Sequence, residues 1–232
     1  METIADRLRK IQGEIAVAAE RCGRQAEDVT LIAISKTHPA EAIREAWDEG
    51  QRIFGESRVQ EALAKIPDLP QAIQWHFIGH IQSNKIRKAL PHFVLFHGID
   101  SADCALAMDR IACEMGLRAR ILLEVNVAGE ATKFGFDREA LKQNMDSLLA
   151  LRSVDIEGLM AIPPAVEKPE DARKYFVSLR ELRDELVSTT GTSLPALSMG
   201  MSDDFSVAIE EGATLVRVGT SIFGRRPRPV VG

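Results

Sequence analysis

Short apolar runs alternate along this chain with segments in which apolar residues recur every three or four positions. The runs are rich in β-branched residues, which is typical of buried strands, whereas the recurring spacing is typical of amphipathic helices. One such helix is expected at residues 2–20, where Ile4, Leu8, Ile11 and Ile15 share a face. Strands are expected at residues 29–36, 52–55, 75–80, 93–99, 120–127, 156–162, 195–200 and 214–219, each followed by a helical pattern or, after the last, by SIFG.

The order of these elements predicts the topology. Strands that alternate with helices pair in parallel, and right-handed crossovers place the helices outside the sheet. Eight strand–helix units in 232 residues predict an α/β fold, a compact (β/α)8 TIM-type barrel with an extra N-terminal helix. A doubly wound open sheet is the alternative, but the chain carries no GxGxxG fingerprint. Because no linker-like stretch interrupts the pattern, residues 1–232 are expected to form a single domain.

Composition narrows the class of protein. The chain is 45% hydrophobic and 27% charged, so it can bury a core. A net charge of −5 without charged blocks argues against a general nucleic-acid binder. Cys22, Cys104 and Cys113 lack CxxC spacing and are interpreted as small buried hydrophobic residues in a reducing compartment. The N-terminus has no apolar signal core and no run approaches a membrane span, so a soluble, cytoplasmic protein is expected.

Candidate chemistry gathers at the predicted carboxyl ends of the strands, where barrels of this kind place their sites. Gly200 and Ser202 follow the seventh strand, and Gly219 and Thr220 follow the eighth. Their hydroxyl and backbone N–H groups suit a phosphate. The alternative is structural, because Ser202 is also a good N-cap for a helix starting at Asp203. Further residues at strand ends are Ser57, His80, Asn126 and Met201.

Lys36 and Arg217 are the two cations at this predicted edge. A lysine at a strand end is usually solvated. Its alternative is Schiff-base chemistry, which needs a neutral amine and is favoured by desolvation or by a nearby cation such as Arg217. Arg217 lies within the apolar strand LVRVG and needs an acceptor, either a carboxylate or a ligand atom. A Schiff-base lysine beside a phosphate cradle indicates a phosphorylated aldehyde or ketone, with pyridoxal 5′-phosphate and a sugar phosphate as the two candidates.

Other motifs point away from metal or nucleophilic chemistry. His76 and His80 have the spacing of a helical metal pair but fall on a predicted strand, so no metal site is expected. Walker A and GxSxG motifs are absent from the sequence. The only tyrosine, Tyr175, is expected in the middle of its helix, far from the strand ends, where it packs. The basic end GRRPRP (224–229) is interpreted as solvated.

Taken together, the motifs resemble the pyridoxal phosphate homeostasis proteins, once called proline synthetase co-transcribed homologue. The matching segments run in order from about Leu31 to Gly224: LIAISKTH, FGESRVQEA, WHFIGHIQSNK, VNVAGEATKFGF, GLMAIPP, LSMGMSDDF and VRVGTSIFG. That family is similar in fold to the barrel of alanine racemase. The resemblance implies that Lys36 forms a Schiff base with pyridoxal 5′-phosphate, that Ser202, Gly219 and Thr220 hold the phosphate, and that Arg217 faces the pyridine nitrogen.

One departure concerns the loop after the second strand. The family usually reads FGENxVQE there, and this chain has Ser57 where the asparagine is expected. The shorter side chain reaches less far toward the cofactor. Ser57, Asn126 and Met201 are therefore secondary candidates for cofactor contact.

The resemblance also carries an expectation about turnover. Barrel racemases use a second base, a tyrosine from a separate β-domain, and this chain has no such domain. We therefore expect a protein that binds pyridoxal phosphate and serves vitamin B6 homeostasis without efficient amino-acid turnover. Apo forms of pyridoxal phosphate-dependent enzymes are the candidate partners, with no nucleic acid or membrane partner, and a monomer or weak dimer is expected. The alternatives are a slow racemase or aminotransferase, with the other proton handled by water or Lys133, and an aldolase-type barrel acting on a sugar phosphate.

Overall fold

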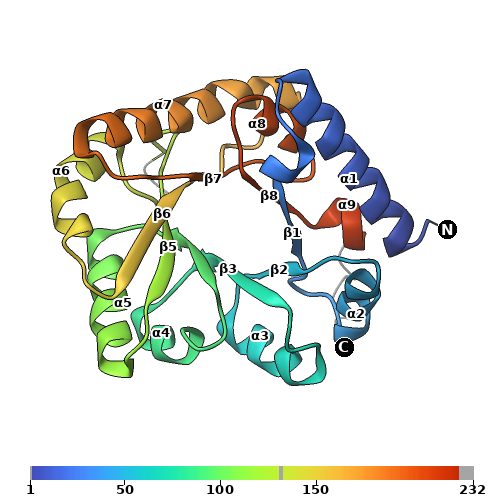
Figure 1. Cartoon of the computed structure of the whole chain (residues 1–232), viewed down its shortest axis with the longest axis horizontal. Coiled ribbons are helices and arrows are strands. Elements are labelled where there is room, and N and C mark those ends of the chain that lie inside the picture. Colours follow the sequence, from blue (N-terminus) through green and yellow to red (C-terminus); the bar gives the residue numbers. More distant parts are fainter. Residues whose placement is uncertain (1, 131–132, 225–232) are drawn as a thin grey trace.

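The computed structural model describes residues 2–130 and 133–224. Eight parallel strands form a closed barrel in chain order, with β8 returning to pair with β1 (Figure 1). The strands are β1 (Thr30–Ile34), β2 (Ile53–Glu56), β3 (Gln74–His80), β4 (Leu95–Ile99), β5 (Ala119–Glu124), β6 (Val154–Met160), β7 (Ala196–Ser198) and β8 (Leu215–Val218). The predicted (β/α)8 barrel is confirmed, and the closing pair excludes the doubly wound sheet.

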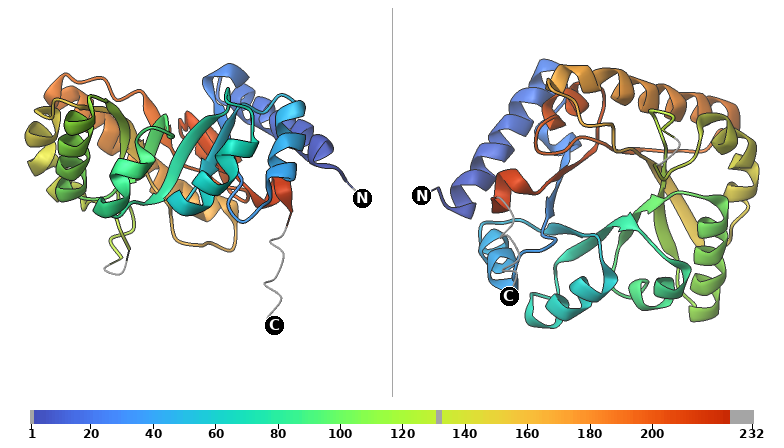
Figure 2. Two further views of the ribbon diagram at one scale, coloured as in Figure 1. Left: turned by 90° about the horizontal axis from the view of Figure 1, so that it is seen from below. Right: turned by 180° about the vertical axis from the view of Figure 1, so that it is seen from behind.

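The helices form an outer ring around the strands, which Figure 2 shows from the side and from behind. They are α1 (Ile4–Arg21), α2 (Ala40–Asp48), α3 (Val59–Lys65), α4 (Ser83–Ala89), α5 (Ala102–Met115), α6 (Arg138–Leu149), α7 (Arg173–Thr190), α8 (Phe205–Glu210) and α9 (Thr220–Phe223). The extra helix α1 begins with a capping box between Thr3 and Asp6 and packs its apolar face against α8 and α9. It therefore covers the part of the ring where the last helices are short.

Each strand divides its residues between two cores. One cluster, which includes Ile32, Ile34, Leu122 and Met160, fills the barrel interior. Their neighbours along the strands, such as Ala33, belong to the larger core between strands and helices. This alternation follows from the two-residue period of a strand. It determines which polar residues reach the inside of the barrel.

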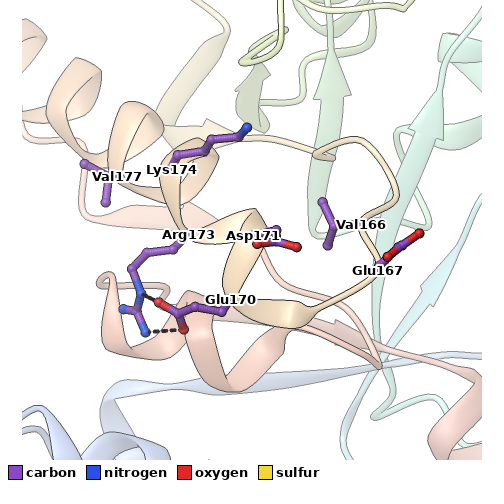
Figure 3. A pocket seen from close by; sticks show the side chains of 7 residues that line it. All are labelled: Val166, Glu167, Glu170, Asp171, Arg173, Lys174 and Val177. Atoms are coloured by element: carbon purple, nitrogen blue, oxygen red, sulfur yellow. Dashed lines mark hydrogen bonds and ion pairs between the residues drawn. The ribbon is translucent and has the colours of Figure 1, made fainter.

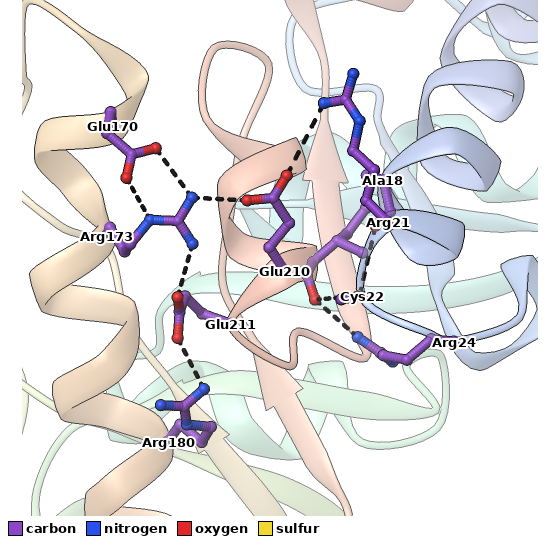
Figure 4. Close-up of polar contacts among 10 residues, drawn as sticks. Ala18, Arg21, Cys22, Arg24, Glu170, Arg173, Arg180, Glu210 and Glu211 are labelled. Atoms are coloured by element: carbon purple, nitrogen blue, oxygen red, sulfur yellow. Dashed lines mark hydrogen bonds and ion pairs between the residues drawn. The ribbon is translucent and has the colours of Figure 1, made fainter.

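A network of ion pairs fixes α8 against α7 (Figure 4). The Arg173 guanidinium binds Glu170, Glu210 and Glu211, and Glu211 also accepts a hydrogen bond from Arg180. Because Arg173 and Arg180 both lie on α7, they hold the end of α8 from one side. The network therefore fixes the C-terminal end of α8, the end away from the β7–α8 loop.

Two features of the sequence interpretation concern the surface. Cys22 and Cys113 are exposed and only Cys104 is buried, so the expectation of three buried thiols is wrong for two of them. Cys22 is the C-cap of α1, and Cys113 lies on the exposed face of α5, next to the buried Ile111 and Ala112. Among the described residues, no helix is long and apolar enough to cross a membrane. The basic end of the chain lies, beyond Gly224, outside those residues.

Candidate functional site

Lys36 lies in a tight turn at the carboxyl end of β1. The strand ends at Ile34, two residues earlier than expected, although Ser35 still donates its N–H to the Gly55 carbonyl at 3.1 Å. Ile32 and Ile34 face the barrel interior, so the alternation carried on by Ser35 places Lys36 on the inward side. The Lys36 side chain is half-buried at the mouth of the barrel.

The backbone of this turn is held in a strained conformation. Thr37 has φ of 68° and is the only non-glycine with a positive φ among residues 2–130 and 133–224. That region is unfavourable for a β-branched residue and persists only where its surroundings enforce it. Here the Thr37 N–H donates to the Glu61 carboxylate, and the His38 N–H donates to the Ser35 carbonyl at 3.0 Å. The position of Lys36 is thus fixed from both sides.

A charged cluster behind the turn supports it from the helix layer. The Glu56 carboxylate is fully buried and accepts hydrogen bonds from Ser35 Oγ at 2.7 Å and Lys65 Nζ at 3.0 Å. Lys65 Nζ also donates to Glu61 at 2.8 Å and to the Ser35 carbonyl at 3.2 Å. Burial raises the pKa of Glu56, and the Lys65 charge opposes that rise. We call Ser35, Glu56, Glu61 and Lys65 the turn clamp.

The end of β8 lies directly beside the Lys36 turn. The His38 ring stacks on Phe223 of α9, with ring centroids 5.0 Å apart. A Cβ added to Gly219 would lie 3.2 Å from both the Cβ and the carbonyl oxygen of Ile34, so a side chain there would press on β1. In α9 the N–H groups of Ile222 and Phe223 donate to the Gly219 carbonyl, whereas those of Thr220 and Ser221, at the start of the helix, have no acceptor within it. The structure therefore brings Lys36, Gly219 and Thr220 together.

Arg217 reaches the barrel interior from the middle of β8. Only 4% of the residue is exposed, and it donates hydrogen bonds to Ser198 Oγ and, at 2.9 Å, to the Ala161 carbonyl. Burial lowers the pKa of Arg217 to about 10, against the opposing charges of Glu124 and Asp204. Within the described residues no carboxylate accepts a hydrogen bond from it. Two of its five N–H donors are used, which leaves three for a ligand acceptor.

Ser202 lies in the turn between β7 and α8, and its predicted capping role is wrong. The helix starts at Phe205, not at Asp203, and its N-cap is Asp204. The Asp204 carboxylate accepts the Met201 N–H at 2.6 Å, which closes a turn and delays the helix. Burial raises the pKa of Asp204. Ser202 is half-buried and Met201 is exposed on the same turn.

The other secondary candidates are placed less favourably. The Asn126 side chain bonds the Glu130 backbone twice, at 2.8 and 3.3 Å, so its amide holds the loop after β5. Ser57 packs against Gly79, where an added Cβ would lie 2.6 Å from the Ser57 carbonyl oxygen. Ser57 is half-buried at the start of the β2–α3 connection. These contacts explain both residues structurally without involving a ligand.

Tyr175 lies in the first turn of α7, so its predicted position in the middle of a helix is wrong. The helical pattern in the sequence starts at Pro169, but a separate 3-10 turn occupies Pro169–Ala172 and α7 starts only at Arg173. Helices of this barrel begin on the side where the strands end. Tyr175 is half-buried in the outer ring, with Lys174 Nζ 5.0 Å from its ring centroid.

Two histidines of β3 have roles that the sequence interpretation missed. His80 Nδ1 lies 2.6 Å from Asp100 Oδ2, and the His80 ring stacks on Phe134 with centroids 4.4 Å apart. The half-buried Glu124 is nearby, and partial burial, together with the Asp100 charge, raises the pKa of its carboxyl group. His76 instead contacts His97 inside the barrel, 3.0 Å between Nδ1 and Nε2. In the part of the chain that the structure describes, no His, Cys, Asp or Glu cluster could hold a metal ion.

A simple signal could have identified these residues. His80 and His76 alternate with apolar residues on their strand, as do His97 and Ser198 on theirs. A polar residue at the inward position of a barrel strand needs a partner inside the barrel. Their partners, however, come from strands distant in sequence.

Two hollows on the molecule differ in their relation to this site. One of about 820 Å³ lies beside the start of α7 (Figure 3), lined by Val166, Glu167, Glu170, Asp171, Arg173, Lys174 and Val177. None of the predicted cofactor-binding residues lines it. A second, of about 750 Å³, lies between the loops after β6 and β7 and includes Met201 and Ser202. The second hollow therefore meets the candidate site only at Met201 and Ser202, and Lys36, Arg217, Gly219 and Thr220 do not line it.

Comparisons with known proteins show the family and the fold. Residues 7–227 match the family model for the alanine racemase N-terminal domain. A pyridoxal phosphate homeostasis protein of Aquifex aeolicus is 46% identical over 222 residues, covering 95% of this chain and 97% of the relative.

Solved structures give the same picture. PipY of Synechococcus elongatus with pyridoxal phosphate bound is 41% identical, with a TM-score of 0.85, covering 96% of this chain and 100% of PipY. An alanine racemase from Clostridium difficile is 16% identical, with a TM-score of 0.75, covering 98% of this chain and 59% of the racemase. The latter likeness concerns the fold alone.

Proposed function

Since this chain belongs to the pyridoxal phosphate homeostasis protein family, we propose that it binds pyridoxal 5′-phosphate through a Schiff base at Lys36 and takes part in intracellular vitamin B6 homeostasis without efficient amino-acid turnover. The observation that carries the proposal is the placement of Lys36, on a strained and clamped turn, at the same barrel mouth as Arg217. The relatives' names and the ligand of PipY favour this cofactor over a sugar phosphate.

The residues at the mouth fit the chemical groups of the cofactor. Bound pyridoxal phosphate supplies an aldehyde for the Schiff base and a ring that withdraws electrons. Lys36 provides the amine, and the unused N–H groups of Arg217 suit the lone pair of the pyridine nitrogen. A guanidinium donates and does not accept a proton, so it leaves that nitrogen unprotonated and weakens electron withdrawal. The Ser202 hydroxyl and the backbone at Gly219 and Thr220 are assigned to the phosphate.

The proposal of inefficient turnover rests on the lack of a matched second base. Tyr175, the only tyrosine, packs beneath Lys174 in the outer helical ring. Lys133, the other candidate from sequence, forms an ion pair with Glu130 at 2.9 Å. The Lys133 amine is thus held by a carboxylate and Tyr175 belongs to the outer ring, which supports a binding role over rapid proton transfer.

An absorbance spectrum tests the attachment. Protein loaded with pyridoxal phosphate is expected to show the visible band of a Schiff base, and Lys36→Ala is expected to abolish it. Lys133→Ala is the matched control, because it removes a lysine from the same end of the barrel, and it should keep the band. An unchanged spectrum in Lys36→Ala would overturn the proposal.

The His80–Asp100 pair favours a second candidate function, a slow pyridoxal phosphate-dependent racemase or aminotransferase. The Asp100 side chain is 6% exposed and orients the imidazole, while the His80 side chain is 39% exposed. An imidazole held by a carboxylate is a suitable proton carrier. Exchange of the α-hydrogen of an amino acid in deuterated water, lost in His80→Asn, would support this function. Exchange no faster than with free pyridoxal phosphate would exclude it.

The proposal also covers the location, the assembly and the partners of the protein. We expect a cytoplasmic protein whose residues 1–232 form one pyridoxal phosphate-binding domain, present as a monomer or weak dimer. Apo forms of pyridoxal phosphate-dependent enzymes are the proposed recipients. Transfer is measured by the activity gained by an apo-enzyme mixed with loaded protein, and a gain no faster than with free cofactor would exclude direct delivery.

A further inference from the structure

A line of hydrogen-bonded polar side chains crosses the barrel interior from its mouth toward its opposite end. Arg217 of β8 donates to Ser198 Oγ of β7. Ser198 Oγ lies 2.8 Å from His97 Nδ1 of β4, and His97 Nε2 lies 3.0 Å from His76 Nδ1 of β3. Ser198 and His97 are fully buried, and His76 is 5% exposed. We call these four residues the polar column.

The donor and acceptor of each bond in the polar column follow from its first member. A guanidinium only donates, so Ser198 Oγ accepts from Arg217. Among the described residues His97 Nδ1 is the only other partner of Ser198 Oγ, so it is also the only acceptor for the hydroxyl proton, and the hydroxyl donates to it. His97 must therefore carry its proton on Nε2 and donate it to His76 Nδ1. His76 in turn carries its proton on Nε2.

Electrostatics agree with two neutral imidazoles. Burial lowers the pKa of His97 well below its usual value, and the neighbouring His76 and the charge of Arg217 also disfavour a His97 cation. Burial also lowers the pKa of His76 to about 4, helped by Arg120. Glu124 and Asp204 are the carboxylates that act on Arg217 from β5 and from the β7–α8 turn. Neither forms a hydrogen bond with it in the described structure.

The polar column cannot serve as a proton wire, because it ends on a guanidinium that stays protonated and has no site to accept a proton. It can fix that guanidinium. An arginine side chain has many rotamers. Here the neutral Ser198 hydroxyl and the Ala161 carbonyl, and not a carboxylate, fix its position. The Ser198 hydroxyl is itself directed by His97, and His97 by His76. At the opposite end of the polar column, His76 lines a cavity of about 380 Å³. This cavity has room for water to accept the hydrogen bond of the His76 Nε2–H group.

We propose that Ser198 and His97 are positioning residues for Arg217, which hold its guanidinium so that its unused N–H groups face the barrel mouth. Its consequence, a contact between Arg217 and the pyridine nitrogen, rests on the proposed function. Its geometric part concerns the protein without cofactor. The two parts are tested separately.

The first experiment uses cofactor-free protein labelled with nitrogen-15. Imidazole spectra at about pH 6 to 8 are expected to show His97 neutral, with its proton on Nε2. In Ser198→Ala the signal of His97 Nδ1 should move toward that of a nitrogen without a hydrogen-bond donor, and Ser198→Thr should restore it. A proton on Nδ1, or a cationic His97, would overturn the assigned direction of the polar column.

The second experiment uses protein loaded with pyridoxal phosphate. Ser198→Ala and His97→Asn are expected to weaken binding about tenfold, the usual effect of losing a hydrogen bond to a charged group. They should also shift the pH midpoint of the absorbance spectrum while leaving Lys36 attached. Ser198→Thr should recover both values. Ser101→Ala is the control, because Ser101 caps α5 through Cys104 N and its loss affects stability only.

The outcomes separate the two proposals. Unchanged affinity and pH midpoint in Ser198→Ala and His97→Asn, with Lys36 still attached, would overturn the positioning role alone. If pyridoxal phosphate is not attached to Lys36 in the protein without substitutions, the proposed function is overturned. The imidazole spectra of cofactor-free protein would still test the polar column. An equal shift in Ser101→Ala would show that the effect reflects general stability, which also overturns the positioning role.

Discussion

Lys65 is the member of the turn clamp whose removal has the most calculable effect. In Lys65→Met the ammonium is lost, while the fully buried Glu56 keeps its carboxyl group. Removing one partner of a buried ion pair costs about 3–5 kcal/mol. Because the Lys65 side chain is still 13% exposed, we expect the lower end, a loss of about 3 kcal/mol in the free energy of unfolding near pH 8.

The loss in Lys65→Met should depend on pH in a defined direction. Burial already raises the pKa of Glu56 above 4.5, and Lys65 opposes this, so the variant raises it further. The folded variant then holds a proton that the unfolded chain releases, and stability falls as pH rises from about 4.5 to the new folded pKa. Each unit of that rise costs about 1.4 kcal/mol. Below about pH 4.5 only lost hydrogen bonds remain, about 1 kcal/mol.

Urea unfolding near pH 8 and below about pH 4.5 measures this dependence. Glu56→Gln added to Lys65→Met should recover part of the loss at high pH, because no charge is left buried. Lys142→Met is the matched control, since Lys142 also binds two carboxylates, Glu139 and Glu185, but on the surface. It should lose little at either pH. An equal loss for Lys65→Met at both pH values, or one as small as that of the control, would refute the reasoning.

Three further changes test other parts of the site. Thr37→Gly should raise the free energy of unfolding by about 0.5 kcal/mol, because glycine adopts the φ of 68° freely; a lower thermal midpoint would contradict this. Gly200→Ala should lower the free energy of unfolding, measured by urea unfolding, by about 2–3 kcal/mol, because the new Cβ would lie 2.6 Å from Ala208 Cβ. Gly212→Ala, equally left-handed but with its nearest neighbour at 3.6 Å, should lose less; equal losses would contradict the steric cause. Ser202→Ala should keep stability within about 0.5 kcal/mol and weaken cofactor binding in a titration, because Ser202 caps no helix; unchanged binding would contradict its assignment.

The fold could be predicted because its signals are local. A period of two within each strand, a helical period between strands and the count of eight units suffice to indicate the barrel. Lys36 and Arg217 could be selected because each interrupts or ends an apolar run. Boundaries were less accurate: β5 ends at Glu124, where a strand to residue 127 was expected. Asn126 instead turns the chain by binding the Glu130 backbone, a contact that hydrophobicity does not reveal.

The supporting contacts of the site could not be predicted because they join distant residues. Ser35 meets Glu56 from 21 positions away, and His97 meets Ser198 from 101 positions away. Periodicity places each residue on a face but does not say which residues share a level of the barrel. The capping role predicted for Ser202 was wrong for a different reason. The Asp204 carboxylate accepts the Met201 N–H and closes a turn before the helix starts, a local hydrogen bond that competes with helix initiation.

The most direct test of the central claim is to map the lysine that carries the cofactor. Protein loaded with pyridoxal phosphate is reduced with borohydride, digested, and its peptides are analysed by mass spectrometry. The account predicts one major modification, at Lys36, in the peptide that follows β1. Modification of another lysine with Lys36 left unmodified would contradict it.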